Sequence, residues 1–379
     1  MQKNRNLFRI TRFILLKAPY IFRFFALFRS PKKRILIIKA DAIGDYILFR
    51  NFIEIVKHSA KYYNYEIDLL GNEIWSDLAT THDGKYVKKF FFTKANSLYH
   101  SPKAVFKLGW QLLGRNYEAV LNPSSTRTFI TDGLAALSGT SNLIGFKSDT
   151  EGIEPKYKAK TDKFYKTLLP IDTSVHFEFA RNRYFFEQVL NQPLNIQKQF
   201  ISANRVKRSG IIIFPGAGLK NRGWEADKFA GLIKKLEQNT GEIIYLAGGH
   251  SEITLCNYIL EKSQSASVAN ISGKTSLTEL IDLVANSAMV ICNDSSAVHI
   301  AAAVDTPFVC IVGGGHFNRF VPYPAGTVKN GVFIYEKMDC YYCNWNCVFK
   351  IEDGQCFPCI AGISIENVWQ AAQKRLTIA

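Results

Sequence analysis

The chain has 379 residues, with 47 Lys and Arg against 32 Asp and Glu, a net charge of +15 and 47% hydrophobic residues. At about 150 residues per domain, this length predicts two domains that each bury a core. Aromatic residues make up 13%, and Gly and Pro number only 25 and 12, which excludes a disordered, collagen-like or low-complexity chain. The absence of an apolar run of about 18 residues argues against a membrane-spanning helix.

Basic charge is concentrated in residues 1–34. This segment has ten Lys and Arg and no acid, so it carries +10, whereas the rest of the chain carries +5. Phe, Leu, Ile and Tyr lie between these cations, which is typical of a helix resting in a lipid headgroup layer. We therefore predict a basic amphipathic arm on an anionic membrane surface. Pro19 predicts two short helices rather than one.

Three other interpretations of residues 1–34 remain open. A secretory signal needs an unbroken apolar core, which Arg12, Lys17 and Arg23 interrupt. A nucleic-acid-binding arm needs the cations but not so many Phe and Leu side chains. The third is a helix packed on the body with a solvated charged face. We rank the membrane surface first.

Residues 35–200 alternate between strand and helix patterns. The β-branched run Ile35–Ile38 predicts a buried parallel strand. A turn over residues 39–45 leads into a helix from about Tyr46 to His58. The other elements predicted here are strands at Glu66–Leu70 and Ala119–Leu121, helices at Phe129–Leu137 and Phe177–Leu190, and loops across 147–172. This alternation indicates an α/β fold.

Residues 208–362 repeat the alternation after a linker at 191–209. The elements predicted here are strands at Gly210–Phe214, Ile243–Ala247, Val290–Cys292 and Phe308–Val312, and a helix from about Ala226 to Gln238. A last helix is expected within 363–379. In open α/β sheets the loops at the carboxyl ends of the strands bind ligands, so ligand-binding residues are expected in those loops.

A polar cluster, Asp294-Ser295-Ser296, follows one predicted strand and precedes a helix. The free N–H groups of such a helix, with two hydroxyls beside them, suit a phosphate. His299 falls one turn along the same helix, where it could reach the same ligand. The alternative is that Asp294 or Ser295 caps the helix and His299 packs in the core.

Two other loops of this half carry candidates for a phosphorylated ligand. Lys220 and Arg222 lie beside Trp224, and a guanidinium forks well onto phosphate oxygens, although such a loop is often only solvated surface. Gly216 belongs to a fragment of a dinucleotide fingerprint and carries little weight. Glu252 could accept hydrogen bonds from a ribose diol; alternatively it is a helix N-terminal acid.

Together these segments resemble glycosyltransferase family 9, whose best-known members are the ADP-heptose lipopolysaccharide heptosyltransferases. The resemblance covers residues 35 to about 370. The blocks that carry it are Ile35–Asp45, Phe214–Ala217, Arg222–Trp224, Gly248–Glu252, Gly273–Leu277 and Asn293–Ala303. It departs from the family at Ser295-Ser296, where Thr-Gly is usual, and at Arg222, where Lys is usual, which leaves the donor's sugar and base open.

The resemblance implies a GT-B architecture, in which two Rossmann-like domains face each other across a cleft. Residues 35–200 would form the acceptor domain, 208–362 the nucleotide-sugar donor domain, and 363–379 a C-terminal helix. It implies inverting, metal-independent sugar transfer from a nucleotide-diphosphate donor, with no cofactor for catalysis.

The resemblance also implies roles for single residues. Asp45 takes the position of the general base, which removes the acceptor's proton, and Asp41 could share that role. The alternative for Asp45 is a helix N-cap. Arg127 and Asp132 are candidate acceptor contacts. The implied donor-binding residues are Gly216, Lys220, Arg222, Trp224, Glu252, Asp294, Ser295, Ser296 and His299.

Five of the eight cysteines cluster near the end of the chain. Cys340, Cys343, Cys347, Cys356 and Cys359 include two C-x-x-C pairs. Their spacing fits a structural metal site (Zn²⁺ or an iron–sulfur cluster), a disulfide, or free thiols, and does not separate these three. Cys256, Cys292 and Cys310 are isolated and are expected to be core thiols.

The sequence thus predicts a membrane-associated glycosyltransferase. It would act on the cytoplasmic face of the inner membrane and move a sugar from ADP-heptose or a similar donor to a lipid-linked saccharide such as lipopolysaccharide core. One alternative is a nucleotide-sugar epimerase or hydrolase on the same scaffold. Another is a Cys-cluster nucleic-acid-binding protein, ranked last because it gives the motifs at 210–303 no purpose, so nucleic acid is not an expected partner.

Overall fold

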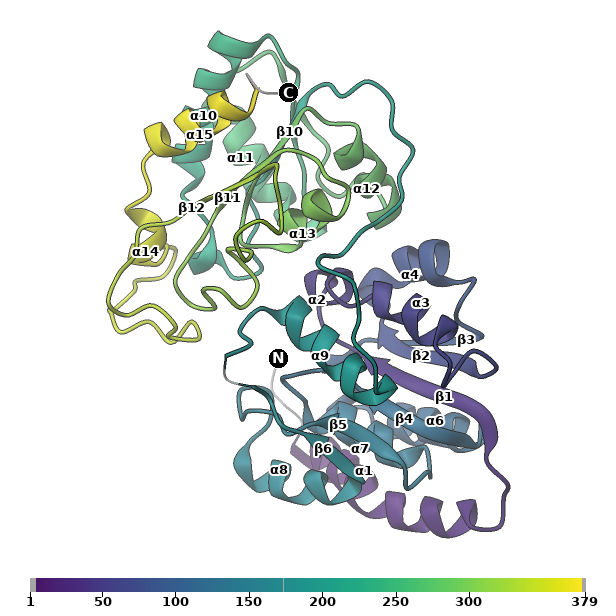
Figure 1. The fold of residues 1–379 in the computed structure, drawn as a ribbon. Helices are drawn as coiled ribbons and strands as arrows, with labels where there is room; N and C mark the ends of the chain where they lie inside the picture. Colours follow the sequence, from purple (N-terminus) through teal and green to yellow (C-terminus); the bar gives the residue numbers. More distant parts are fainter. Residues whose placement is uncertain (1–4, 173, 377–379) are drawn as a thin grey trace. The chain divides into compact units, whose positions relative to one another are not determined.

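The computed structural model describes residues 5–172 and 174–376, which form two compact units (Figure 1). The boundary between unit 1 and unit 2 falls between Ile196 and Gln197, inside the linker expected at 191–209. Each unit is an α/β domain with a parallel sheet, so the predicted fold class is confirmed.

Unit 1 contains a six-stranded parallel sheet in the order β3-β2-β1-β4-β5-β6. This is the strand order of a Rossmann domain. The chain adds β2 and β3 on one side of β1 and then β4, β5 and β6 on the other, so the switch point of the sheet lies between β1 and β4. The strands are β1 (Lys32–Lys39), β2 (Glu66–Asn72), β3 (Lys89–Thr93), β4 (Tyr117–Asn122), β5 (Leu143–Phe146) and β6 (Thr167–Leu169).

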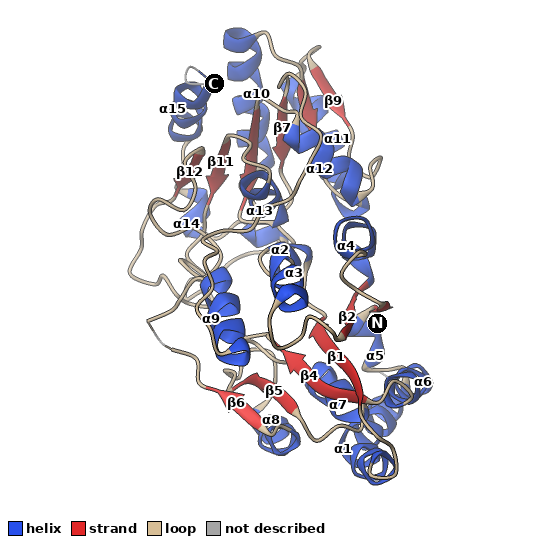
Figure 2. Cartoon of the chain, turned by 45° about the vertical axis from the view of Figure 1, so that its right-hand side comes forward, coloured by secondary structure: helices blue, strands red, loops and turns tan. Residues whose placement is uncertain are grey.

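The helices of unit 1 cover both faces of this sheet (Figure 2). They are α1 (Arg5–Ala26), α2 (Ile43–Ile47), α3 (Asn51–His58), α4 (Ser76–Asp83), α5 (Ala95–Leu98), α6 (Pro102–Leu113), α7 (Phe129–Leu137), α8 (Pro155–Thr161) and α9 (Glu178–Leu190), with 3₁₀ turns η1 (Glu73–Trp75) and η2 (Asp162–Phe164). The α1 helix packs on α6 and α7. The α3 helix packs on α9, where the ring of Phe52 stacks on that of Phe186 at 5.3 Å.

Unit 2 repeats the same topology. Its strands are all parallel and lie in the order β12-β11-β10-β7-β8-β9. The switch point of this sheet lies between β7 and β10. The strands are β7 (Ile211–Phe214), β8 (Ile244–Leu246), β9 (Val268–Asn270), β10 (Met289–Asn293), β11 (Phe308–Ile311) and β12 (Gly331–Ile334). The helices are α10 (Ala226–Thr240), α11 (Ile253–Ser263), α12 (Leu277–Ala285), α13 (Ser296–Ala303), α14 (Pro358–Ala361) and α15 (Ile365–Leu376), with η3 (Lys220–Arg222) and η4 (His250–Glu252).

The N-terminal arm is one helix, so the expected break at Pro19 is wrong. The Pro19 side chain lies on the buried face of α1 with Leu15 and Phe22. These contacts with α6 and α7 offset the hydrogen bond that proline cannot donate. In the described part of the chain, no helix is both long and apolar enough to cross a bilayer.

Two other expectations of local structure are also wrong. The helix expected from Tyr46 to His58 is two helices, α2 and α3, separated at residues 48–50. The segment 147–172, expected to be loops, contains α8, η2 and the edge strand β6. The β6 strand has only 3 residues and is not fully buried, so its sequence shows no hydrophobic periodicity that would predict a strand.

Candidate functional site

The two loops at the switch point of unit 2 are brought together by strand register. Cys292 of β10 pairs with Phe214 of β7, so these strands end at the same level. The next residue, Asn293, is fully buried and joins the loops: its Nδ2 donates to the carbonyl oxygen of Pro215 (2.7 Å), and its Oδ1 accepts from the backbone N–H of Trp224 (3.0 Å). Asn293 fixes the geometry of the site. It directly precedes the polar cluster, but it was not among the residues predicted from the sequence to bind a ligand.

Arg222 and Asp294 meet at this point. A guanidinium nitrogen of Arg222 lies 3.7 Å from a carboxylate oxygen of Asp294. Burial raises the pKa of Asp294 and lowers the pKa of Arg222, and in each case the charge of the partner opposes the effect. Among the described residues, the Arg222 Nε–H has no hydrogen-bond partner. One N–H of the guanidinium thus lacks a hydrogen bond, and an anionic ligand that accepted from it would stabilise the side chain.

The N-terminus of α13 adjoins this pair in sequence. Ser295 is the N-cap residue with an extended backbone, but its side chain makes no capping hydrogen bond. A helix of this kind leaves backbone N–H groups of the first turn available to a ligand. Capping therefore does not explain Ser295, which keeps the phosphate interpretation of Asp294, Ser295 and Ser296 as the prediction to test.

His299 lies one turn along α13 and is buried. Its Nδ1 is 2.7 Å from the Tyr323 hydroxyl, and that hydroxyl accepts a hydrogen bond from Gln199 Nε2 at 2.6 Å. Burial lowers the pKa of His299 to about 3, so the ring is neutral at physiological pH. The structure shows the packing that the sequence analysis gave as the alternative, and contact with a donor stays a prediction.

Glu252 occupies the space beside two glycines. Its Oε2 accepts from the Gly249 backbone N–H at 2.7 Å, and its Oε1 accepts from the Ser251 hydroxyl at 2.6 Å. A Cβ atom at Gly216 would lie 2.6 Å from Glu252 Cγ, and one at Gly248 would lie 2.7 Å from Glu252 Cβ. The glycines therefore let the Glu252 side chain lie against both loops. Its carboxylate holds the turn at Gly249, and contact with a ribose stays a prediction.

Lys220 and Trp224 have different surroundings from each other. Lys220 is exposed in η3, as a solvated basic side chain would be. Trp224 is buried, and its indole N–H donates to the carbonyl oxygen of Ile363 at 2.9 Å. Trp224 therefore anchors the loop that carries Arg222, and direct contact of either residue with a donor stays a prediction.

The switch point of unit 1 carries the two candidate carboxylates. Asp41 follows β1, and its Oδ2 is 2.8 Å from Lys39 Nζ and accepts a hydrogen bond from the Ser124 hydroxyl, which follows β4, at 2.8 Å. Lys39 is buried, and although burial opposes its charge, Asp41 and Asp45 outweigh that effect and raise its pKa. Asp41 is thus held by structural partners.

Asp45 is placed differently. It lies inside α2, whose N-cap is Ala42, so the alternative in which Asp45 caps the helix is wrong. Its side chain is half-buried, and its charge acts on Lys39. The residue keeps its predicted role as general base, a role that nothing in this geometry tests.

Arg127 and Asp132 form a buried ion pair in unit 1. Both side chains are fully inaccessible, with Arg127 Nη1 3.2 Å from Asp132 Oδ2. The carboxylate also accepts hydrogen bonds from the Tyr165 hydroxyl (2.7 Å) and the Thr161 hydroxyl (2.6 Å). Contact with an acceptor, as predicted, would require this network to open.

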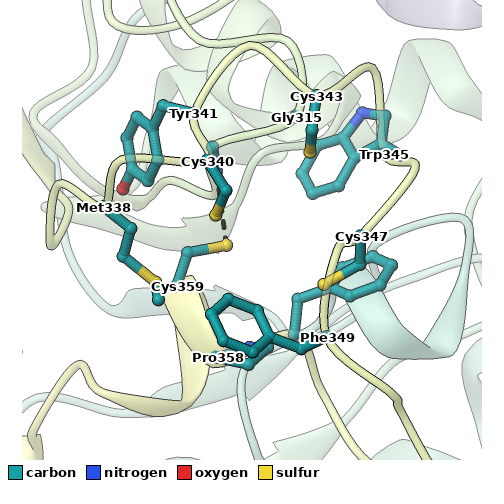
Figure 3. Close-up of a pocket in the computed structure, with 12 residues that line it drawn as sticks. Gly315, Met338, Cys340, Tyr341, Cys343, Trp345, Cys347, Phe349, Pro358 and Cys359 are labelled. Atoms are coloured by element: carbon teal, nitrogen blue, oxygen red, sulfur yellow. Dashed lines mark hydrogen bonds between the residues drawn. The ribbon is translucent and has the colours of Figure 1, made fainter.

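The cysteines of the C-terminal cluster are free thiols. Cys340, Cys343, Cys347 and Cys359 line one small cavity, in which only the sulfur atoms of Cys340 and Cys359 point toward each other (Figure 3). The Cys356 thiol lies elsewhere, 3.5 Å from Glu225 Oε1. Over residues 5–172 and 174–376, no group of three or more His, Cys, Asp or Glu side chains is placed to hold a metal ion, so the structural Zn²⁺ finds no support.

Known heptosyltransferases have sequences or folds related to those of this chain. Lipopolysaccharide heptosyltransferase 3 of Escherichia coli strain K12 is 27% identical over 139 residues, which are 36% of this chain and only 40% of that relative. The solved structure of E. coli ADP-heptose LPS heptosyltransferase II matches 91% of this chain and 99% of its own, with a TM-score of 0.67 and 17% identity. A family 9 glycosyltransferase from Veillonella parvula matches 92% and 98%, with a TM-score of 0.70 and 17% identity.

The structural matches establish the fold alone, which is the GT-B fold of two Rossmann-like domains predicted from the sequence. Family membership comes from the sequence profile described as glycosyltransferase family 9 (heptosyltransferase), which matches residues 105–344. That stretch includes the loop of Arg222 and the whole of the polar cluster at Asp294. The chain belongs to glycosyltransferase family 9.

Proposed function

We propose that this protein transfers a heptosyl group from a nucleotide-diphosphate donor such as ADP-heptose to a lipid-linked saccharide of the lipopolysaccharide core type. The observation that supports a diphosphate most directly is the half-buried guanidinium of Arg222, whose Nε–H has no hydrogen-bond partner among the described residues, beside the uncapped N-terminus of α13. The relatives named as heptosyltransferases support the choice of sugar.

In the proposed reaction, the acceptor hydroxyl attacks the anomeric carbon as the bond to the nucleoside diphosphate breaks. Asp45 takes the proton of that hydroxyl. The charge that grows on the leaving diphosphate is stabilised by Arg222 and by the N–H groups of α13, without a required metal ion. A single displacement of this kind inverts the anomeric configuration.

We further propose that the protein works as a peripheral protein on the cytoplasmic face of the membrane that holds its acceptor. The α1 helix has two apolar faces. One face, with Leu15 and Phe22, is buried against α6 and α7. The other is exposed and aromatic, with Phe13 at 66%, Phe24 at 57% and, in the turn that follows, Phe28 at 75%.

A helix that only covers the body needs a single apolar face, so the exposed face is unexplained by packing. Residues 1–34 carry +10 and no acid, which complements an anionic headgroup layer. Exposed apolar side chains are also present on α6, where Phe106 and Trp110 lie beside the buried ring of Phe22, at ring-centre distances of 6.2 Å and 5.9 Å. These features favour a lipid surface as the occupant.

Donor binding and product analysis test the transfer. Melting temperatures are measured with ADP-, GDP-, UDP- and CDP-sugars, because a ligand of the native state raises the melting temperature. The best donor is then incubated with and without a lipid-linked saccharide, in the presence and absence of EDTA, and products are identified by mass spectrometry.

We expect donor consumption only when the acceptor is present, with equal yield in EDTA. Consumption without an acceptor, giving free sugar or an epimerised donor, would instead identify a hydrolase or epimerase. A protein that binds none of these nucleotides would contradict the proposed function outright.

A further inference from the structure

The Cys-rich segment 340–359 contacts the loop that carries Arg222. The Phe357 backbone N–H donates to the Asn221 carbonyl oxygen at 2.8 Å, and Asn221 Nδ2 donates to the Gln355 carbonyl oxygen at 2.8 Å. These bonds join the segment to the residue directly before Arg222. A segment whose role the sequence left open is therefore attached to the candidate donor site.

Trp345 makes the most direct contact in this arrangement. The Arg222 guanidinium carbon lies 4.1 Å from the centre of the Trp345 ring, which is the geometry of a close cation–π stack. Trp345 lies one residue beyond the stretch that the family profile matches. No periodicity or motif points to it.

The Trp345 ring is itself held on its other sides. Its indole N–H donates to His316 Nδ1 at 3.1 Å, and its ring stacks on Phe357 at 5.8 Å. A Cβ atom at Gly315 would lie 2.2 Å from the Trp345 ring, and one at Gly313 would lie 2.8 Å from it, so only glycine lets the ring lie this close to the loop after β11.

The backbone of Trp345 is also constrained. Its φ angle is +62°, in the left-handed region that a bulky side chain rarely adopts. Such a conformation persists only where the surrounding contacts determine it. The contacts with Gly315, His316 and Phe357 supply that determination, so the ring is a rigid platform rather than a mobile side chain.

We infer that Trp345 is the positioning residue of the donor site: it holds the Arg222 guanidinium in one plane for contact with the donor diphosphate. A guanidinium fixed before binding loses less conformational entropy when the ligand arrives. A flat guanidinium stacks on an indole better than a lysine ammonium does, which gives a reason for arginine at position 222, where the family resemblance leads one to expect lysine.

This inference rests on the proposed function, because it takes Arg222 to bind the donor diphosphate. The experiment is a double-mutant cycle with Arg222→Lys, Trp345→Ala and both together, and ADP is the probe for calorimetric binding. Trp345→Phe tests rescue by a smaller aromatic ring. Phe349→Ala is the matched control, since Phe349 lies in the same Cys-rich segment and lines the same cavity.

We expect Trp345→Ala to weaken ADP binding about 10-fold, with Trp345→Phe recovering part of the loss. In turnover, the donor KM should rise by a similar factor while kcat at saturating donor is retained. In the Arg222→Lys background, Trp345→Ala should have little further effect on ADP binding, and Phe349→Ala should bind ADP as the unmodified protein does.

Three results would overturn the inference. One is unchanged ADP binding in Trp345→Ala, another is an equal loss in both Arg222 backgrounds, and the third is an equal loss in Phe349→Ala. If the unmodified protein binds no nucleoside diphosphate at all, the proposed function fails first and the role of Trp345 fails with it, so the two failures are distinguishable.

Discussion

Among single residues, Asp41 and Asp45 differ in what their carboxylates are already doing. Asp41 compensates the buried ammonium of Lys39 and accepts a hydrogen bond from Ser124. Asp45 lies within α2 and is half-buried. The resemblance to family 9 gives the role of general base to Asp45, and substitution of each carboxylate tests that role.

Alanine at each position should separate these roles. We expect Asp45→Ala to lower kcat by about 10²- to 10⁴-fold, the usual contribution of a general base, while the donor still binds and the melting temperature is kept. Asp41→Ala should instead destabilise the fold by about 3–5 kcal/mol, because the buried ammonium of Lys39 loses its ion pair with Asp41. Turnover assays and thermal melts measure both. Normal turnover in Asp45→Ala would remove that residue from the mechanism.

His299 predicts a pH dependence of stability. Its pKa is about 3 in the fold, because burial disfavours the charged ring, against an ordinary value of 6.5. Between these values the unfolded chain binds a proton that the folded chain does not, so stability is complete above pH 6.5 and falls as the pH is lowered. The maximum slope is about 1.4 kcal/mol per pH unit.

The variant His299→Gln removes this titration and keeps a side chain that can bond to Tyr323. We expect its melting temperature to fall less between pH 7.5 and pH 5.0 than that of the unmodified protein. Identical pH dependence in the two proteins would show that His299 is charged or accessible in the folded state.

Among the elements, α1 is both part of the fold and the candidate membrane contact. Leu15 is fully buried, and a Cβ atom at Gly133 of α7 would lie 2.5 Å from it, so α1 and α7 approach closely. Deleting residues 1–30 would therefore expose the apolar surfaces of α6 and α7 as well as removing the arm. Substitutions on the exposed face separate the two roles.

The triple variant Phe13→Ser, Phe24→Ser, Phe28→Ser should retain folding and lose binding to vesicles that contain anionic phosphatidylglycerol, because those rings supply the apolar insertion. Co-sedimentation at low and high salt measures the loss. The matched control replaces Tyr63, Ile74 and Val206, which are exposed elsewhere, by serine. Equal binding by both triple variants would contradict a role of this face, and self-association in place of lipid binding would assign it to a second copy of the chain.

At the scale of the whole molecule, the two units repeat one strand order, and each places its candidate residues at the switch point of its sheet. In unit 1 the loops after β1 and β4 meet through Asp41 and Ser124. In unit 2 the loops after β7 and β10 meet through Arg222 and Asp294. The repeated topology explains why residues distant in sequence form local sites, since parallel strands bring their carboxyl ends to one edge.

The sequence by itself determined the α/β class, the central strands β1, β7 and β10, and the polar cluster after β10. These features are local, because a buried parallel strand reads as a continuous apolar run and a helix start follows it directly. Short or half-buried strands such as β3, β6, β9 and β12 gave no such signal. Pairing with a neighbouring strand, rather than their own pattern, makes them strands.

Only the tertiary structure decided what surrounds each candidate residue. It stacked Trp345 on Arg222 across more than a hundred residues of chain, buried Arg127 with Asp132, and gave His299 a partner in Tyr323. It also kept α1 as one helix through Pro19 by packing that face on α6 and α7. The physical reason is common to all four cases. Burial and side-chain contact depend on which segments of the chain meet in the fold, and composition and periodicity do not specify those contacts.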